Sequence, residues 1–323
     1  MIKGLVVFYS VIILSGCSQI GASVDITSQP SQVNSVSKLI DEKVLMQDFK
    51  ALSSAQMAGR KSLSKGSFAA QDYLENSLVA HGVMPFKGQY RHPFTYEKHN
   101  TEYQGTNIIG FKQGTSEKYI VVTAHYDHLG VKAGKVFYGA DDNASGTAAV
   151  LNIAKAYENL PARHNIIYLF TDAEEQNLIG AFAFAEQFPV IMDKTLININ
   201  IDMIAGARST KRLYYLPYQV KPISEANWLT SFSAYASKYK LQLRKGPPAY
   251  RRVQGQKTKM NWRKASDHGV FYANKIPFIY YGVGVHNNYH TTKDTFENTN
   301  HVFYKSAVYT IFDQLYDLEQ QID

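Results

Sequence analysis

Cysteine is almost absent from this chain, because Cys17 is the only one in 323 residues. An intramolecular disulfide is therefore excluded, and a hydrophobic core has to stabilise the fold. The residues after Cys17 are numerous enough for one large domain or two small ones. None of the apolar runs beyond the first 17 residues is long enough to span a bilayer as a helix.

Several catalytic motifs are also absent. The sequence contains no H-E-x-x-H motif and no Walker A motif, which excludes the metalloproteases and nucleotide-binding proteins that depend on them. No G-x-S-x-G turn surrounds Ser145, so this serine does not match the nucleophile of an α/β-hydrolase.

The N-terminus has the pattern of a secretory signal. Lys3 precedes the apolar run Leu5–Leu14, which is too short to cross a membrane. The next residues complete "LSGC", which resembles the lipobox of bacterial lipoproteins, where the cysteine is lipidated and becomes the first mature residue. We predict that residues 1–17 are a lipoprotein signal peptide and that a lipid on Cys17 anchors the protein to a membrane. An ordinary secretory signal is the alternative.

The residues after Cys17 indicate the location of the protein. Ser18 at this position resembles a signal for outer-membrane sorting. We therefore expect a protein of the bacterial cell envelope, anchored to the outer membrane and facing the periplasm or the exterior. Residues 18–36 are rich in Ser and Gln, which predicts a flexible tether to a domain at residues 37–323.

Basic charge is concentrated in one segment. The chain has a formal net charge of +7, and Arg244–Lys264 contains eight Lys or Arg residues and no acid. No nucleic-acid-binding motif accompanies this segment, so we interpret it as a solvated loop and expect no nucleic acid as a partner. Attraction of acidic peptides to a nearby site remains a second hypothesis.

Strand and helix patterns alternate along the chain. Apolar runs predict strands at residues 106–111, 119–125, 165–171, 196–202 and 276–282, and helical periodicity predicts helices near residues 37–52, 67–81, 144–158, 178–188, 225–239 and 302–318. This alternation predicts a three-layer α/β/α sandwich around a mixed, mostly parallel sheet. Residues 205–263 are the least regular, and we expect them to form an irregular insertion over one edge.

Polar side chains gather at the ends of three buried strands. One strand ends at His125, with Asp127 two residues later; the next leads into Glu174 and Glu175, and a third ends at Asp202. Ligands bind beyond the carboxyl ends of strands in such sheets, so we expect these groups to lie together.

Two further segments supply metal-competent groups. "GADDNASG" contains the adjacent carboxylates Asp141 and Asp142 before a helix, and "YHTTKDT" contains His290. An Asp in such a place can simply cap the helix. Nitrogen and oxygen donors without thiolate suit zinc or a similar ion, and the donors are too many for one tetrahedral site. Two ions that share a carboxylate would account for them, an arrangement used in hydrolysis.

The full set of motifs resembles a known family. "MAGR", "TNIIG", "AHYDHLG", "GADDNASG", "DAEEQNLIGA", "NIDMI", "SDHGVF" and "YHTTKDT" occur in the order found in secreted co-catalytic zinc exopeptidases, especially bacterial leucyl-type aminopeptidases. The resemblance implies a metalloprotease with two Zn²⁺ per chain that removes N-terminal residues from peptides with a free N-terminus. Glutamate carboxypeptidases and the single-zinc glutaminyl cyclases are relatives and remain alternatives.

The resemblance also implies a role for each group. Asp141 would bridge the ions, one held with Glu175 and His290 and the other with His125 and Asp202. Glu174 would be the general base. The resemblance further implies that Asp127 supports the His125 imidazole, that Asp267 supports the site, and that the peptide bond between Asp141 and Asp142 is cis. Apart from the resemblance, we interpret Asp142 and His128 as packing, capping or supporting residues. We expect an apolar pocket for the substrate, with contacts from Met203, Asp267, Tyr281 and Tyr289 and with Tyr280 in the same region.

Overall fold

The computed structural model describes Met1 and residues 35–222, 225–247, 252–253, 256–257 and 260–323. Residues 2–34 lie outside this range, and with them Cys17 and most of the predicted signal and tether. Asn34–Asp323 forms one compact unit. The predicted tether extends through residue 36. Its last residue is wrong, because Val36 is buried in the core of the domain and its amide donates to Asp313.

A nine-stranded sheet is the central layer of the described residues, with the order β1-β3-β7-β4-β8-β13-β9-β10 and β2 paired to β3. Its strands are β1 (Met84–Pro85), β2 (Arg91–Lys98), β3 (Thr101–Lys112), β4 (Tyr119–His125), β7 (Asn165–Thr171), β8 (Thr195–Ile201), β9 (Arg212–Tyr218), β10 (Gln242–Lys245) and β13 (Phe278–Gly282). The central strands β7, β4, β8 and β13 are parallel, whereas β3 and β9 pair antiparallel on either side. The mixed sheet is therefore confirmed, with parallel pairs in its centre and one further parallel pair, β9 with β10, at one edge.

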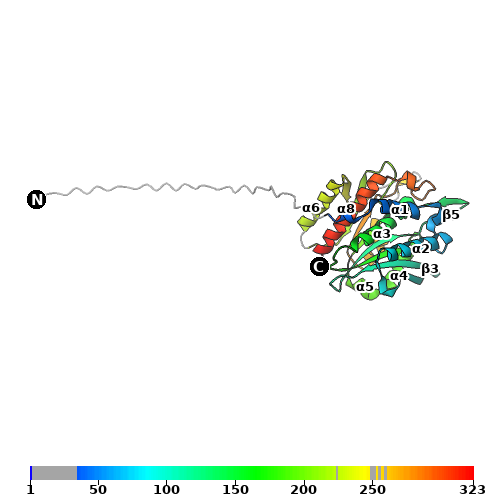
Figure 1. The fold of residues 1–323 in the computed structure, drawn as a ribbon, viewed down its shortest axis with the longest axis horizontal. Coiled ribbons are helices and arrows are strands. Elements are labelled where there is room, and N and C mark those ends of the chain that lie inside the picture. Colours follow the sequence, from blue (N-terminus) through cyan, green and yellow to red (C-terminus); the bar gives the residue numbers. More distant parts are fainter. Residues whose placement is uncertain (2–34, 223–224, 248–251, 254–255, 258–259) are drawn as a thin grey trace. The chain divides into compact units, whose positions relative to one another are not determined.

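Helices cover both faces of the sheet (Figure 1). They are α1 (Glu42–Leu52), α2 (Lys65–Ala80), α3 (Gly146–Tyr157), α4 (Ile179–Gln187), α5 (Pro189–Lys194), α6 (Glu225–Lys238), α7 (His268–Ala273) and α8 (His301–Gln321). Helices α1, α2, α3, α6 and α8 contribute to one core cluster, and α4, α5 and α7 contribute to the other. The predicted three-layer α/β/α architecture is confirmed.

Strand alternation explains the two cores. Ile120 and Val122 of β4 point into the larger cluster, and Val121 between them points into the smaller one. Successive side chains of a strand point to opposite faces, so a strand covered on both sides has to be apolar throughout. Each fully buried aliphatic or aromatic side chain contributes about 1.5–3 kcal/mol to this packing.

The segment 205–263 is more regular than expected. It supplies β9 and β10 to the central sheet, and α6 packs on the same face as α8. The prediction of an irregular insertion is wrong for these elements, because Leu213 and Tyr215 of β9 complete the apolar layer that Trp228 and Phe232 of α6 also join.

Two short hairpins lie outside the main sheet: β5 (Gly130–Lys132) with β6 (Lys135–Phe137), and β11 (Arg252–Val253) with β12 (Gln256–Lys257). The second of them falls within the predicted basic loop. In the described part of the chain, no helix combines the length and the apolar character needed to cross a bilayer.

Candidate metal centre

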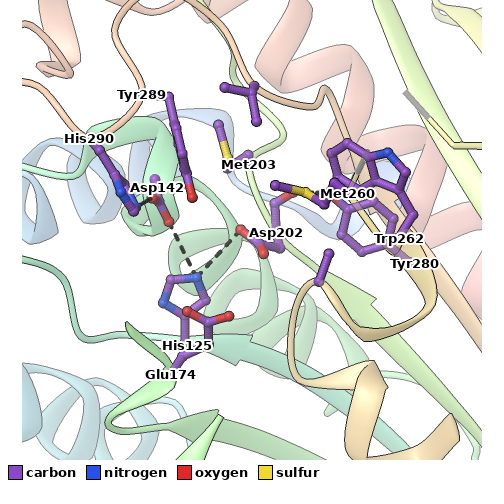
Figure 2. Close-up of a pocket in the computed structure, with 12 residues that line it drawn as sticks. His125, Asp142, Glu174, Asp202, Met203, Met260, Trp262, Tyr280, Tyr289 and His290 are labelled. Carbon is purple, nitrogen blue, oxygen red and sulfur yellow. Dashed lines mark hydrogen bonds and ion pairs between the residues drawn. The ribbon is translucent and has the colours of Figure 1, made fainter. Parts of the chain in front are cut away.

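The carboxyl ends of the central parallel strands carry the candidate site. His125 is the last residue of β4, and Asp202 follows β8 directly. Glu174 and Glu175 lie in a short 3₁₀ turn (Glu174–Gln176) after β7, and His290 lies in the loop after β13. The strands are parallel, so these ends meet at one edge of the sheet, and Figure 2 shows four of these side chains around a common cavity.

The structure corrects the choice between the two adjacent aspartates. Asp142, not Asp141, lies between the two histidines: its Oδ1 is 3.4 Å from His125 Nε2, and its Oδ2 is 3.0 Å from His290 Nε2. His125 Nε2 is also 3.4 Å from Asp202 Oδ1. The carboxylate placed to be shared by two ions is therefore that of Asp142.

Asp141 has a structural position behind the site. Its Oδ1 accepts hydrogen bonds from the amides of Ala205 and Gly206, both at 2.8 Å, and its Oδ2 lies 2.7 Å from His286 Nε2. The carboxylate thus fixes the loop that follows Asp202, and the prediction of Asp141 as the bridging ligand is wrong.

The backbone around Asp142 is held from several directions. The Asp294 carboxylate accepts hydrogen bonds from the amides of Asp141 and Asp142, at 2.9 and 3.1 Å. The Asn143 side chain donates to the carbonyl of Ile201 and accepts from the amide of Met203, which ties the segment to the end of β8. The cis peptide bond joins Asp142 to Asn143, so the predicted cis bond one residue earlier is wrong.

The donor atoms form two groups. His128, Asp142, Glu175 and His290 each offer one atom within 4.8 Å of the others, and so do His125, Glu174 and Asp202. His290 Nε2 is 3.2 Å from Glu175 Oε2. We call the first the histidine-rich cluster and the second the His125 cluster. Asp142 lies at their border through its contact with His125.

Asp127 positions both sides of the site. Its main-chain oxygen is 3.2 Å from His125 Nδ1, and its carboxylate is 3.7 Å from the same nitrogen. The carboxylate accepts hydrogen bonds from the amides of Glu174 and Glu175, at 3.0 and 3.3 Å. Asp127 therefore lies beside the second ring nitrogen of His125, as expected, and it also orients the glutamate turn.

The carboxylates at this edge are crowded. Burial, and then the charge of Glu175, raise the pKa of Asp142. Burial also raises the pKa of Glu174 well above its usual range; His125 opposes this rise, and the charges of Asp202, Asp267 and Glu175 add to it. Such raised pKa values are expected where several buried acids lack a compensating cation.

Unpartnered atoms support a cation at this place. Asp202 Oδ1, Glu175 Oε1 and His128 Nδ1 are buried, and none of the described residues forms a hydrogen bond with them. Buried polar atoms are nearly always paired, so three such atoms at one place, in contact only with other donor residues of the clusters, favour a bound cation. Imidazole nitrogens and carboxylate oxygens without thiolate are donors that suit zinc. The residues present therefore fit the metal that the sequence implies.

A cavity opens next to the two clusters. Its lining comprises His125, Asp142, Glu174, Asp202, Met203, Met260, Trp262, Ala265, Tyr280, Val285, Tyr289 and His290. Figure 2 shows the polar donors on one side and Met260, Trp262 and Tyr280 on the other. The polar groups thus face an apolar and aromatic wall across a small space.

Two of the four residues predicted to contact substrate line this cavity, namely Met203 and Tyr289. Tyr281 does not, because its hydroxyl donates to Gln314 within the larger core, so this prediction is wrong and Tyr280 takes its place. Asp267 is also outside the lining: it is fully buried and accepts a 2.6 Å hydrogen bond from Thr171. Burial is the largest cause that raises its pKa to about 7.

Arg60 of the "MAGR" segment is a buried cation close to this edge. Its side chain is fully buried, and its guanidinium donates to the main-chain oxygens of Leu52, Tyr126, Tyr138 and Gly139. Burial lowers the pKa of Arg60 to about 10, although the charges of Asp127 and Asp142 oppose this. The side chain therefore joins the end of α1 to Tyr126, which follows His125, and to Tyr138 and Gly139, which precede Asp142.

Replacing Arg60 by Met is expected to reduce the free energy of unfolding by about 3–5 kcal/mol, because four carbonyls, three of them in buried hydrogen bonds, would lose their donor. Urea unfolding of the purified variant measures this change. Arg60→Lys keeps the charge but offers fewer directed donors, so its free energy of unfolding should lie between those of the wild type and Arg60→Met. Equal stability of the Met variant and the wild type would contradict the structural role.

A three-layer α/β fold with His and carboxylate donors at the carboxyl ends of its parallel strands is typical of metal-dependent hydrolases. A family model described as Peptidase family M28 matches residues 107–313, more than half of the 323-residue chain, so the protein belongs to this family. The family predicted from the motifs is thereby confirmed.

Sequence relatives match only part of the chain. Aminopeptidase YwaD of Bacillus subtilis (strain 168) is 31% identical over 108 residues, which cover 32% of this chain and 23% of the relative. A glutamate carboxypeptidase 2 homolog of Caenorhabditis elegans is 36% identical over 110 residues, covering 31% of this chain and 13% of the relative. Each match thus spans less than a quarter of the length of the relative concerned.

Solved structures show a likeness of fold over most of the chain. The aminopeptidase from Aneurinibacillus sp. strain AM-1 has a TM-score of 0.65 at 15% identity, with 88% of this chain and 95% of that one covered. Porphyromonas gingivalis glutaminyl cyclase has a TM-score of 0.67 at 18% identity, with 86% and 99% covered. Fold alone therefore does not separate a peptidase from a cyclase.

Proposed function

We propose that the protein is an aminopeptidase that holds two zinc ions. The observation that carries this proposal is the pair of donor clusters at one edge of the sheet, which share a border at Asp142. Membership of Peptidase family M28 and the partial similarity to an aminopeptidase support hydrolysis of peptides. Two ions at such clusters would polarise the scissile carbonyl and lower the pKa of a water molecule.

Glu174 is the residue best placed to move a proton. It lines the cavity beside His125 and Asp202 (Figure 2), and Asp127 fixes its backbone. A carboxylate there can take a proton from the attacking water and deliver it to the leaving amine. Burial raises the pKa of Glu174, and bound cations would lower it.

Tyr289 faces the same space. Figure 2 shows its hydroxyl directed toward the carboxylates of the cavity, and its ring stacks on His290 with a centroid distance of 3.8 Å. Burial raises the pKa of this phenol far above its usual range, so it stays protonated and can donate to a developing oxyanion.

The substrate enters with its N-terminal residue toward the cavity. The acidic clusters attract a free ammonium group, which favours peptides with a free N-terminus. Met203, Met260, Trp262 and Tyr280 offer an apolar and aromatic wall for the first side chain. Trp262 and Tyr280 lie together, with ring centroids 6.1 Å apart. Bulky apolar N-terminal residues are therefore the preferred class.

A single-zinc glutaminyl cyclase is the second candidate, favoured by the structural likeness to the enzyme from Porphyromonas gingivalis. The two activities need different metal contents. The histidine-rich cluster has four donors, and His125, Asp202 and the shared Asp142 offer three for a second ion without Glu174, which supports two ions over one. A carboxypeptidase of the same family is a further alternative that a substrate screen would separate.

Removal of metal tests the proposal. Dialysis against a chelator should abolish the release of N-terminal residues from aminoacyl fluorogenic substrates, and two equivalents of zinc per chain should restore it. Metal analysis by mass spectrometry gives the stoichiometry. Restoration by one equivalent together with cyclisation of N-terminal glutamine would favour the cyclase, and full activity in chelator would exclude both.

We also propose that the protein is anchored by a lipid on Cys17, at the outer membrane of a bacterial envelope. The signal pattern and its final "LSGC" support this location. A lipid chain binds the bilayer with about 0.8 kcal/mol per buried methylene. Cys17→Ala should therefore move the protein from the membrane fraction to the soluble fraction. Continued sedimentation of the variant with membranes would indicate another contact.

A further inference from the structure

His128 is a buried histidine that the roles above do not use. It lies three residues after the end of β4 and is 1% exposed. Its Nδ1 is 2.8 Å from Glu175 Oε1 and 3.7 Å from Asp142 Oδ2, and its ring packs edge-on against that of His290 with centroids 5.7 Å apart. The imidazole is therefore directed at the same two carboxylates as His290.

The short contact between His128 and Glu175 joins an imidazole nitrogen to a carboxylate oxygen, and it is an ion pair only when the imidazole is protonated. Among the described residues, neither His128 Nδ1 nor Glu175 Oε1 has a hydrogen-bond partner, although the two atoms are 2.8 Å apart. When the imidazole is neutral and the lone pair of Nδ1 faces the carboxylate, the two atoms repel each other at this distance. A cation held between them would remove this repulsion.

Packing holds the ring in this orientation. A Cβ atom added to Gly139 would lie 2.5 Å from both Cγ and Cδ2 of His128, so the main chain at Gly139 lies directly against the imidazole. Gly139 has a φ of 59°, a conformation that glycine adopts readily. The ring cannot turn toward Gly139, and Nδ1 stays directed at the carboxylates.

We propose that His128 is a fourth metal ligand, completing the histidine-rich cluster with Asp142, Glu175 and His290. This inference rests on the proposed function, because it requires that the cluster bind a metal. Four protein donors are the usual set of a closed zinc site, whereas three donors leave a position for water or substrate. The histidine-rich cluster would hold its ion more tightly, and the His125 cluster would hold the ion that exchanges and carries the open position.

The first test measures metal affinity. Apo protein is titrated with zinc in a metal-ion buffer, in the wild type, His128→Ala and His128→Asn. Loss of a supporting residue reduces zinc affinity about 10–100-fold, so loss of a ligand should weaken the tighter site more than about 100-fold. His92→Gln is the control, since His92 is also buried but lies on β2, away from the clusters. Unchanged affinity in the His128 variants would overturn the proposal.

The second test separates a ligand from a residue that only positions Glu175. His128→Cys in a Cys17→Ser background is loaded with Co²⁺, and the near-ultraviolet spectrum is recorded. A thiolate bound to cobalt gives a charge-transfer band that nitrogen and oxygen donors do not give, so the variant should gain this band and the wild type should lack it. Cobalt bound at normal stoichiometry without the band would overturn the proposal.

The cobalt measurement uses the His128→Cys variant, so it does not depend on the stability of His128→Ala. Circular dichroism first checks that each variant is folded. Failure of this inference is also distinct from failure of the proposed function. A wild-type protein that binds no zinc would refute the aminopeptidase. A wild type that binds two zinc ions with an affinity unaffected by residue 128 would refute only the role of His128.

Discussion

Asp142→Asn is expected to weaken metal binding at both clusters more than about 100-fold and to reduce peptidase activity at least as much. The reason is the position of its carboxylate, which contacts His125 through Oδ1 and His290 through Oδ2. An amide has only one acceptor oxygen and no charge, so it can serve at most one side of the site. Zinc per chain after gel filtration in a metal-ion buffer measures the effect.

Asp141→Asn is the matched control. The amide oxygen can still accept from Ala205 and Gly206, while the contact with His286 loses its charge. We expect normal zinc content and a loss of about 1–3 kcal/mol in the free energy of unfolding. If Asp141→Asn lost the metals and Asp142→Asn kept them, the assignment of the bridging carboxylate would have to be reversed.

The two neighbouring aspartates show why the sequence analysis assigned the bridging carboxylate to Asp141, one residue before the correct position. Both lie between Ala140 and the sequence "NASG", and either could begin the segment before α3. The choice depends on distant partners: Asp294 fixes the two amides, and Asn143 ties the segment to β8. These contacts turn one carboxylate toward His125 and the other toward His286, and the local sequence carries no signal for them.

Tyr280 and Tyr281 illustrate the same difficulty in a strand. Both lie in β13, which was predicted, but successive side chains point to opposite faces. Tyr280 faces the cavity, whereas Tyr281 packs in the larger core. An error of one residue therefore exchanges a substrate contact for a core residue.

The central strands were predictable because burial on both faces requires continuous apolar runs. The ranges expected for β4 and β7 agree with the structure at both ends. Once these parallel strands are known, the rule that ligands lie beyond their carboxyl ends brings together His125, Glu174 and Asp202. A fold class and three donors thus follow from pattern and topology alone.

The apolar wall of the cavity could not be predicted in this way. Met260 and Trp262 lie within the basic segment, which has no strand or helix periodicity, and only the tertiary fold brings them to the cavity beside Tyr280 of β13. His128 was interpreted as a packing residue, although it follows His125 by only three positions. A second histidine three residues after a candidate metal ligand at the end of a strand could have indicated a further ligand.

Glu174→Gln is expected to keep both metals and the fold while reducing kcat by about 10²–10⁴-fold. Glutamine has nearly the same shape but cannot take a proton from water. The backbone of residue 174 is held by Asp127, so the side chain should remain in the cavity. Zinc content, a thermal unfolding curve and kcat on one fluorogenic peptide are measured on the same preparation.

Glu175→Gln separates the roles of the two adjacent glutamates. Burial raises the pKa of Glu175, but the imidazoles of His128 and His290 outweigh this effect and hold it well below its usual range, as expected for a carboxylate that faces cations. Glu175→Gln should therefore lose zinc, whereas Glu174→Gln should lose only turnover.

Glu174 also lies within the His125 cluster, so a role as a metal ligand is the alternative to a general base. In that case Glu174→Gln would lose about one zinc per chain, and excess zinc would partly restore its activity. A general base predicts full zinc content and no rescue, so the two assignments give opposite results in the same measurement.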